Sequence, residues 1–160
     1  MILALLSSSL AFSKGESKKL TFALNNKDQK TFDHKDLSSS HIKTKKGELI
    51  AIQMQMFDPI INAEKNYEGY LLFDMLDLVY GDLWKKAKRI VFKANDGFAK
   101  MVKIPKLVKH SKGKLGMVAF KEVGHTGFQN FTRKGNEVNP GPYYLVWTHY
   151  SLQDKKKIGD

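Results

Sequence analysis

The sequence contains no cysteine among its 160 residues. A disulfide, a thiolate metal ligand and a cysteine nucleophile are therefore excluded, and the fold must rely on its apolar core. Arginine is also scarce, because only Arg89 and Arg133 accompany the lysines that produce the net charge of +11. Lysine carries a flexible, hydrated point charge, whereas proteins that read nucleic acids depend on the planar arginine fork.

The basic excess predicts a partner of opposite charge. The sequence has no helix-turn-helix pattern, zinc-finger spacing or aromatic RNA-binding signature, so we expect no nucleic acid as the partner. An acidic protein or an anionic membrane surface fits the charge. The charge alone favours a lysine-rich solvated surface that reflects the composition of the organism.

Long apolar runs are missing as well, and the most apolar stretch lies at the N-terminus. Residues 2–6 are apolar, and small residues follow, with Ala11 and Ser13 placed as before a signal-peptidase cut. We therefore predict a signal peptide over residues 1–13, and a periplasmic or secreted protein. The alternative is a buried N-terminal strand or helix. The run is shorter than the roughly 20 apolar residues of a membrane span, so no transmembrane span is expected.

Hydropathy patterns predict short strands around one helix. Leu72, Met75, Leu76 and Val79 repeat at three and four residues, as in an amphipathic helix, and Gly81 ends it. Apolar or alternating segments predict strands at 20–24, 49–57, 89–94, 98–104, 115–121 and 143–147.

This pattern indicates an α+β fold, with short strands and one or two helices in a single mixed domain. We place that domain at residues 14–153 and a charged tail at residues 154–160. The polar, Gly-containing stretch from 122 to 142 is expected to be a long loop.

Four segments also match a family pattern in their order. Tyr67–Leu76 has the form aromatic-x-Gly-x-x-Leu before a helix, and Asp96–Phe98 is an Asp-Gly-aromatic turn. Leu115–Phe120 is an apolar strand, and Gly141–Trp147 is a Gly-Pro segment that enters a strand. Together they resemble the oxidoreductase molybdopterin-binding domain of the sulfite-oxidase type. The resemblance covers roughly residues 49–150 and implies the sulfite-oxidase-like fold.

The missing cysteine argues against the chemistry of that family. Its members hold molybdenum with a cysteine thiolate, in the region that here reads Gln53–Pro59 and offers only Met54 and Met56. A neutral thioether cannot replace a thiolate on a hard, high-valent metal. We therefore expect a degenerate, exported and non-catalytic relative without a cofactor, which binds a small anionic ligand or an acidic redox protein. The alternative is an oxidoreductase component that binds a molybdopterin cofactor without a cysteine ligand.

The candidate ligand site lies in the loop at 123–142 and just after the last strand. Its glycines permit tight turns, in which backbone N–H groups can meet an anion. His125, Arg133 and Lys134 add donors and charge, Phe128 adds an apolar wall, and His149 follows the strand that the loop precedes. The alternative is a mobile surface loop without a ligand.

Other catalytic patterns are absent. The five histidines include no pair at the i, i+4 spacing of a helical zinc site, and the sequence has neither a Gly-x-Ser-x-Gly elbow nor a P-loop. We interpret Asp96 as a turn-stabilising residue. The sequence therefore predicts no catalytic residue and no metal ligand.

Overall fold

The computed structural model describes residues 2–7, 19–25, 27–94, 99–110 and 116–147. These residues form 13 strands, three short α-helices and one 3₁₀-helix. The strands belong to several small, mainly antiparallel sheets. The protein is thus mostly β, and the predicted α+β fold of the sulfite-oxidase type is wrong.

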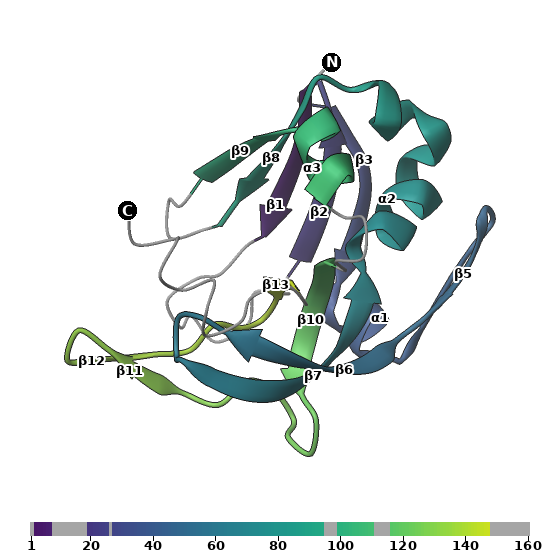
Figure 1. Cartoon of the computed structure of the whole chain (residues 1–160). Coiled ribbons are helices and arrows are strands. Elements are labelled where there is room, and N and C mark those ends of the chain that lie inside the picture. The colour runs from purple at the N-terminus through teal and green to yellow at the C-terminus, as the bar shows by residue number, and fades with distance from the viewer. Residues whose placement is uncertain (1, 8–18, 26, 95–98, 111–115, 148–160) are drawn as a thin grey trace. The chain divides into compact units, whose positions relative to one another are not determined.

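The chain divides into two compact units. The first comprises residues 1–50 and 73–113, and the second comprises residues 51–72 and 114–160. Each unit has its own sheet (Figure 1).

The first unit is built on a five-stranded sheet with the order β3-β2-β1-β8-β9. Its strands are β1 (Ile2–Ser7), β2 (Lys19–Leu24), β3 (Lys27–Asp33), β8 (Arg89–Lys93) and β9 (Ala99–Lys103). β1 pairs parallel with β8 and antiparallel with β2. The segment predicted as a signal peptide therefore supplies the central strand, in line with the alternative of an N-terminal strand, while its cleavage stays a prediction.

Helices and a ribbon complete the first unit. They are α1 (His34–Ser38), α2 (Leu72–Tyr80), η1 (Gly81–Lys86), α3 (Ile104–His110) and the hairpin of β4 (His41–Thr44) with β5 (Gly47–Ile50). The predicted amphipathic helix is confirmed as α2, whose Met75, Leu76 and Val79 are buried. α2 ends at Tyr80, and the next residue, Gly81, has a positive φ of 55°.

The core of the first unit lies between the sheet and α2. Phe22 of β2 meets Phe32 of β3 and Tyr80 of α2 with ring centroids 5.8 and 6.1 Å apart. The Tyr80 hydroxyl donates to the Ala23 carbonyl oxygen at 3.1 Å, which ties the end of α2 to the sheet. Alternating residues of β2 supply this apolar face, as the sequence pattern predicts.

The second unit is an antiparallel sheet with the order β13-β10-β7-β6. Its strands are β6 (Ile52–Asp58), β7 (Ala63–Leu71), β10 (Gly116–Glu122) and β13 (Tyr144–Trp147), and a small hairpin joins β11 (Phe131–Arg133) to β12 (Asn136–Val138). Met56, Tyr67, Met117, Ala119, Phe128 and Val146 form its core. At Gly69 an added Cβ would lie 2.3 Å from the Val118 carbonyl oxygen, so β7 and β10 approach closely only because the residue is glycine.

Several predicted elements are confirmed and others differ. Strands occur where they were predicted near 20, 52, 90, 100, 117 and 144. The strand predicted at 98–104 ends at Lys103, and Pro105 lies in the first turn of α3, a position where a missing N–H costs nothing. The predicted long loop contains the β11–β12 hairpin. The Asp96–Gly97 turn and the charged tail lie outside the described residues.

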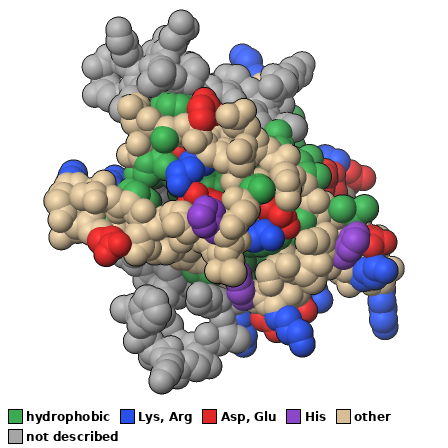
Figure 2. Space-filling view, turned by 90° about the horizontal axis from the view of Figure 1, so that it is seen from below, with side chains coloured by type: hydrophobic (Ala, Val, Ile, Leu, Met, Phe, Trp, Pro, Cys, Tyr) green, Lys and Arg blue, Asp and Glu red, His purple; other side chains and the backbone are tan. Residues whose placement is uncertain are grey.

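None of the helices in the described part of the chain is long and apolar enough to cross a membrane. In the view of Figure 2, basic, acidic and histidine side chains are interspersed with neutral surface.

Candidate binding surfaces

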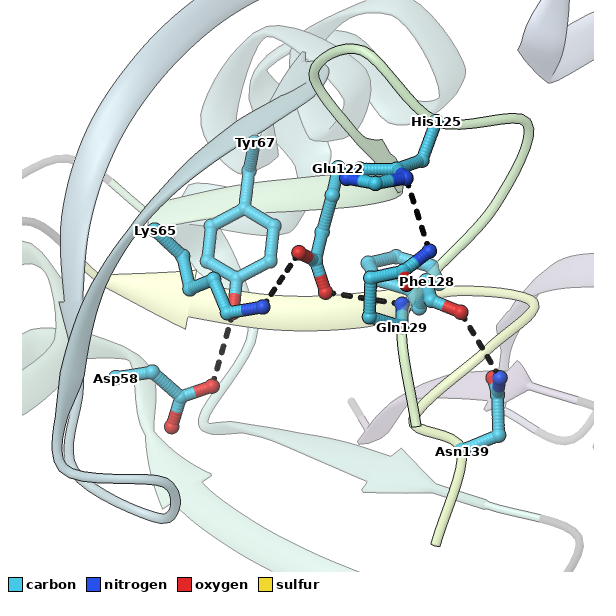
Figure 3. A network of polar contacts seen from close by, with 8 residues as sticks. All are labelled: Asp58, Lys65, Tyr67, Glu122, His125, Phe128, Gln129 and Asn139. Carbon is cyan, nitrogen blue, oxygen red and sulfur yellow. Dashed lines mark hydrogen bonds and ion pairs between the residues drawn. The ribbon is translucent and has the colours of Figure 1, made fainter. Parts of the chain in front are cut away.

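Glu122, the last residue of β10, organises the loop that carries the predicted ligand site (Figure 3). Its side chain is nearly buried, and one carboxylate oxygen accepts a hydrogen bond from Lys65 Nζ at 2.6 Å. The other oxygen accepts from the Gln129 backbone N–H at 3.0 Å. Glu122 therefore joins β7 and the following loop through one charged group, whose burial is compensated by both partners.

His125 and Phe128 lie within this loop as structural residues. The His125 Nδ1 atom is 3.0 Å from Gln129 Nε2, and its backbone N–H donates to the Glu122 carbonyl oxygen. The Phe128 ring is buried, with its centroid 6.2 Å from those of both Tyr67 and Tyr144. Phe128 is thus a core residue, and it is not an exposed wall of a pocket.

Asn139 holds the return of the same loop. Its Nδ2 donates to the Phe128 carbonyl oxygen at 3.0 Å, and its Oδ1 accepts from the Gly141 backbone N–H at 2.8 Å. With the contacts of Glu122, these bonds tie the loop to the sheet at several points (Figure 3). Sequence reasoning missed Glu122 and Asn139, because their importance depends on partners far along the chain.

Arg133 and Lys134 lie apart from that network, at the tip of the β11–β12 hairpin. Both side chains are exposed. Lys134 and Gly135 have positive φ values of 51° and 80°, as in a tight hairpin turn. The structure therefore places His125 and Phe128 in one loop and the two cations on a separate hairpin. His149 lies outside the described residues, and ligand binding by this set stays a prediction.

A buried carboxylate, Asp58, lies at the end of β6. It accepts hydrogen bonds from the Tyr67 hydroxyl at 3.0 Å and from the Ile60 backbone N–H at 2.8 Å, and the Tyr144 hydroxyl bonds to it as well. Burial, and then the negative charge of Asp58, raises the pKa of both tyrosines far above the usual range. Both hydroxyls therefore remain donors at neutral pH, and the cluster is a structural anchor.

The basic excess is concentrated in the first unit, between residues 85 and 110, which we call the basic segment. It contains nine Lys or Arg residues and one acidic residue, Asp96, a net of +8 out of the +11 of the chain. All nine cations are exposed; they are Lys85, Lys86, Lys88, Arg89, Lys93, Lys100, Lys103, Lys106 and Lys109.

Only Lys85 of these nine forms an ion pair with a carboxylate of another described residue. Its Nζ lies 3.2 Å from Asp77 and 3.0 Å from Asp82. The remaining eight cations, in η1, β8, β9, α3 and the link before β8, form no ion pair with a carboxylate of a described residue. Such a concentration of charge attracts an anionic partner over a distance set by the Debye length, about 8 Å at physiological salt.

An apolar groove of about 420 Å³ opens beside the basic segment, within the same unit. Phe73 and Trp84 stack at 5.1 Å along it, and Ile104, Pro105 and Val108 of α3 form the opposite wall. Asp77 and Lys85 lie at its margin, where Asp77 accepts a hydrogen bond from Trp84 Nε1 at 2.6 Å. A groove of this composition accommodates an apolar side chain with a polar neighbour.

The described residues contain no group of three His, Asp or Glu side chains arranged to hold a metal ion. Compared with known proteins, the chain matches no family model and no curated protein.

Proposed function

We propose that this chain is a non-catalytic binding protein whose basic segment recognises an acidic protein partner. The observation that carries the proposal is the set of eight exposed cations without an ion pair to a described carboxylate, gathered within one stretch of the first unit. A solvated surface that served solubility alone would usually intersperse charges of both signs. This stretch instead concentrates one sign.

The type of cation favours a protein over a nucleic acid. Eight of the nine cations are lysines, which attract negative charge without the bidentate geometry that reads bases or clamps phosphates. Carboxylates of a protein partner need no such fork. The neighbouring groove between Trp84 and Val108 adds an apolar site beside the charges, and stable protein interfaces combine such a core with a polar rim.

A small anionic ligand is the second candidate, and it has a different location. Arg133 and Lys134 present two adjacent, exposed cations on the β11–β12 hairpin. Burial and Asp58 raise the pKa of the Tyr144 phenol, and the charge of Arg133 lowers it by a smaller amount. The guanidinium therefore interacts electrostatically with the polar end of the second unit's core. Export of the protein remains part of the proposal, because periplasmic and secreted proteins meet such ligands directly.

The proposal is tested with a fluorescent polyglutamate peptide as the acidic probe. We expect a variant with Lys100, Lys103 and Lys106 changed to Gln to bind it about ten-fold more weakly at low salt, from three exposed charge interactions of about 0.5 kcal/mol each. The matched control changes Lys27, Lys35 and Lys45 to Gln, which are also exposed lysines of the first unit. Fluorescence anisotropy measures both.

The two variants have the same net charge, so equal losses of affinity would show that only diffuse charge attracts the probe. That result would refute a specific acidic-partner surface. Arg133→Ala is a third arm: loss of inorganic phosphate or citrate binding in this variant alone would favour the small-anion site. Retained binding of both probes in all variants would refute both candidates.

A further inference from the structure

β9 is an edge strand of the five-stranded sheet. β8 pairs with it on one side, in an antiparallel register without a shift, and among the described strands none pairs on its other side. Ala99, Lys100, Met101 and Lys103 are all exposed, and Met101 is 55% exposed. An edge strand presents unpaired backbone donors and acceptors, which can template a further strand.

The register shows which backbone groups point outward. The Ile104 backbone N–H donates to the Lys88 carbonyl oxygen at 3.2 Å, one pair beyond the Arg89–Lys103 pair of the ladder. Hydrogen-bonded and non-hydrogen-bonded pairs alternate along antiparallel strands. Lys100 and Val102 therefore bond to β8, whereas Ala99, Met101 and Lys103 direct their N–H and C=O groups away from it.

The charges of the side chains on β9 and β8 determine which kind of strand can pair with this edge. The side chains on the same face as Met101 include Lys103 of β9 and Arg89 and Lys93 of β8, by the period of two and the register. The opposite edge strand, β3, carries two lysines and two aspartates and has no net charge. A second copy of β9 would place lysine beside lysine, which is unfavourable between paired strands. An acidic strand matches β9 and no other edge of this sheet.

We infer that β9 receives an extended acidic segment of the partner protein as an added β-strand. The segment hydrogen-bonds to the outward backbone groups of Ala99, Met101 and Lys103. Its carboxylates lie beside Lys103, with Arg89 and Lys93 on the same face one strand further in. Main-chain bonds of this kind supply affinity, while alternate side chains supply selectivity. This inference rests on the proposed function and specifies the form of the partner.

Lysines on edge strands also have a protective role, because they discourage aggregation through strand pairing. The two roles are compatible, since a lysine-bearing edge repels apolar or basic strands and attracts an acidic one. They differ in outcome: protection alone predicts that no extended peptide pairs with β9.

The first test uses two peptides of equal charge. One is a fluorescent peptide of about ten alternating Glu and Val residues, a usual strand length, and the other is the same peptide N-methylated at every residue, so that the donors on both of its edges are removed. N-methylation removes backbone donors and leaves the carboxylates in place. We expect the methylated peptide to bind the full chain about ten-fold more weakly, because two or three backbone hydrogen bonds are lost.

The second test changes β9 itself. Met101→Pro removes an N–H that points away from β8, so the β8–β9 ladder keeps its bonds, and proline is tolerated at such edge positions. We expect this variant to bind the unmethylated peptide as weakly as the wild type binds the methylated one. Met101→Ala, which keeps the N–H, should bind like the wild type, and circular dichroism checks that both variants fold.

The outcomes separate the inference from the proposed function. Equal binding of both peptides to the wild type would overturn strand addition and leave an acidic partner bound by charge. Absence of binding by either peptide and by polyglutamate would overturn both. Binding to anionic vesicles without peptide binding, or dimers of the chain that are lost in Met101→Pro, would overturn the inference in favour of a membrane surface or a second copy. If Met101→Pro fails to fold, the methylated peptide still decides.

Discussion

Replacing either of two buried tyrosines on β7 by Phe should have opposite effects on stability at neutral pH and the same effect at alkaline pH. Tyr67 and Tyr70 are each only 1% exposed. The Tyr67 hydroxyl donates to Asp58, whereas the Tyr70 hydroxyl has no hydrogen-bond partner among the described residues. Tyr67→Phe should therefore destabilise the protein by roughly 1.5–3 kcal/mol, because it removes a bond to a buried carboxylate. Tyr70→Phe should be neutral or stabilising by up to about 1 kcal/mol.

The alkaline effect follows from the pKa values of the same hydroxyls. Burial, followed by the charge of Glu68, raises the pKa of Tyr70 to about 12, and burial with Asp58 raises the pKa of Tyr67 further. Unfolded tyrosine loses its proton near pH 10, so above that pH the unfolded chain binds fewer protons than the folded one. Stability is therefore complete below about pH 10 and falls as the pH rises toward the folded pKa values.

The size of this loss can be calculated. Each tyrosine that ionises only after unfolding lowers the free energy of unfolding by about 1 kcal/mol between pH 10 and 11, where the unfolded residue is only partly ionised, so the two together lower it by roughly 2 kcal/mol. This is a large share of the roughly 5–15 kcal/mol that stabilises a typical domain. Urea unfolding at a series of pH values measures the slope, and either Phe variant should reduce the contribution of the pair by half.

Tyrosinate absorbance of the folded protein gives the decisive check. We expect Tyr67 and Tyr70 to remain largely protonated at about pH 11, and so should Tyr80 and Tyr144, whose pKa values burial raises as well. If all six tyrosines of the sequence ionise together near pH 10 while the circular dichroism remains native, the two hydroxyls are accessible to water and the reasoning is refuted. Equal destabilisation by Tyr67→Phe and Tyr70→Phe at neutral pH would refute the assigned role of Asp58.

Three further predictions concern packing, the loop and the N-terminus. Gly69→Ala should destabilise the second unit by about 3 kcal/mol or more, as overpacking against backbone does, whereas Gly127→Ala, with open space around it, should have little effect in thermal melts. Glu122→Gln should lower the free energy of unfolding, measured in urea, by about 1–3 kcal/mol. Glu48→Gln, which removes an exposed ion pair of 3.8 Å with Lys43, should lower it by less than about 0.5 kcal/mol. Sequencing of the native N-terminus should begin near residue 14 if the predicted signal peptide is cleaved, and a native start at Met1 would refute cleavage.

The predicted absence of a cofactor, and its alternative of a molybdopterin bound without cysteine, also remain open to measurement. We expect native protein to contain no molybdenum. About one molybdenum atom per chain in protein purified from its host would refute this expectation. Because the sulfite-oxidase-like fold is wrong, the resemblance no longer supports the alternative.

The parts of the fold that sequence predicts correctly are those set by local periodicity. The spacing of Leu72, Met75, Leu76 and Val79 identifies α2, and alternation identifies β2 and β6. Pairing between strands is not local, so the sequence cannot show that β1 joins β2 to β8 across more than 80 residues. The start of α3 was missed because Pro105 fits both the end of a strand and the first turn of a helix.

The candidate site shows the same limit. The loop at 123–142 contains His125 and Phe128 as predicted, but their orientation depends on Glu122, Tyr67 and Tyr144 from three separate strands. Phe128 is an aromatic residue in a polar stretch, which fits an exposed wall as well as a core residue that fixes the loop. The basic segment, in contrast, had a signal in the sequence, because the charge counted from 85 to 110 exceeds that of any other stretch of this length.

The spacing of the lysines shows why the role of this charge can be inferred only from the folded structure. Lys100, Lys103, Lys106 and Lys109 recur every three residues. In β9 a separation of three places Lys100 and Lys103 on opposite faces of the sheet, whereas in α3 the same separation places Lys106 and Lys109 on one side of the helix. An edge strand thus carries positive charge on both faces, and any strand that pairs with it meets that charge whichever way its side chains alternate. Apolar and basic strands are excluded by the lysines that attract an acidic one, so a single feature provides both protection of the edge and choice of the partner.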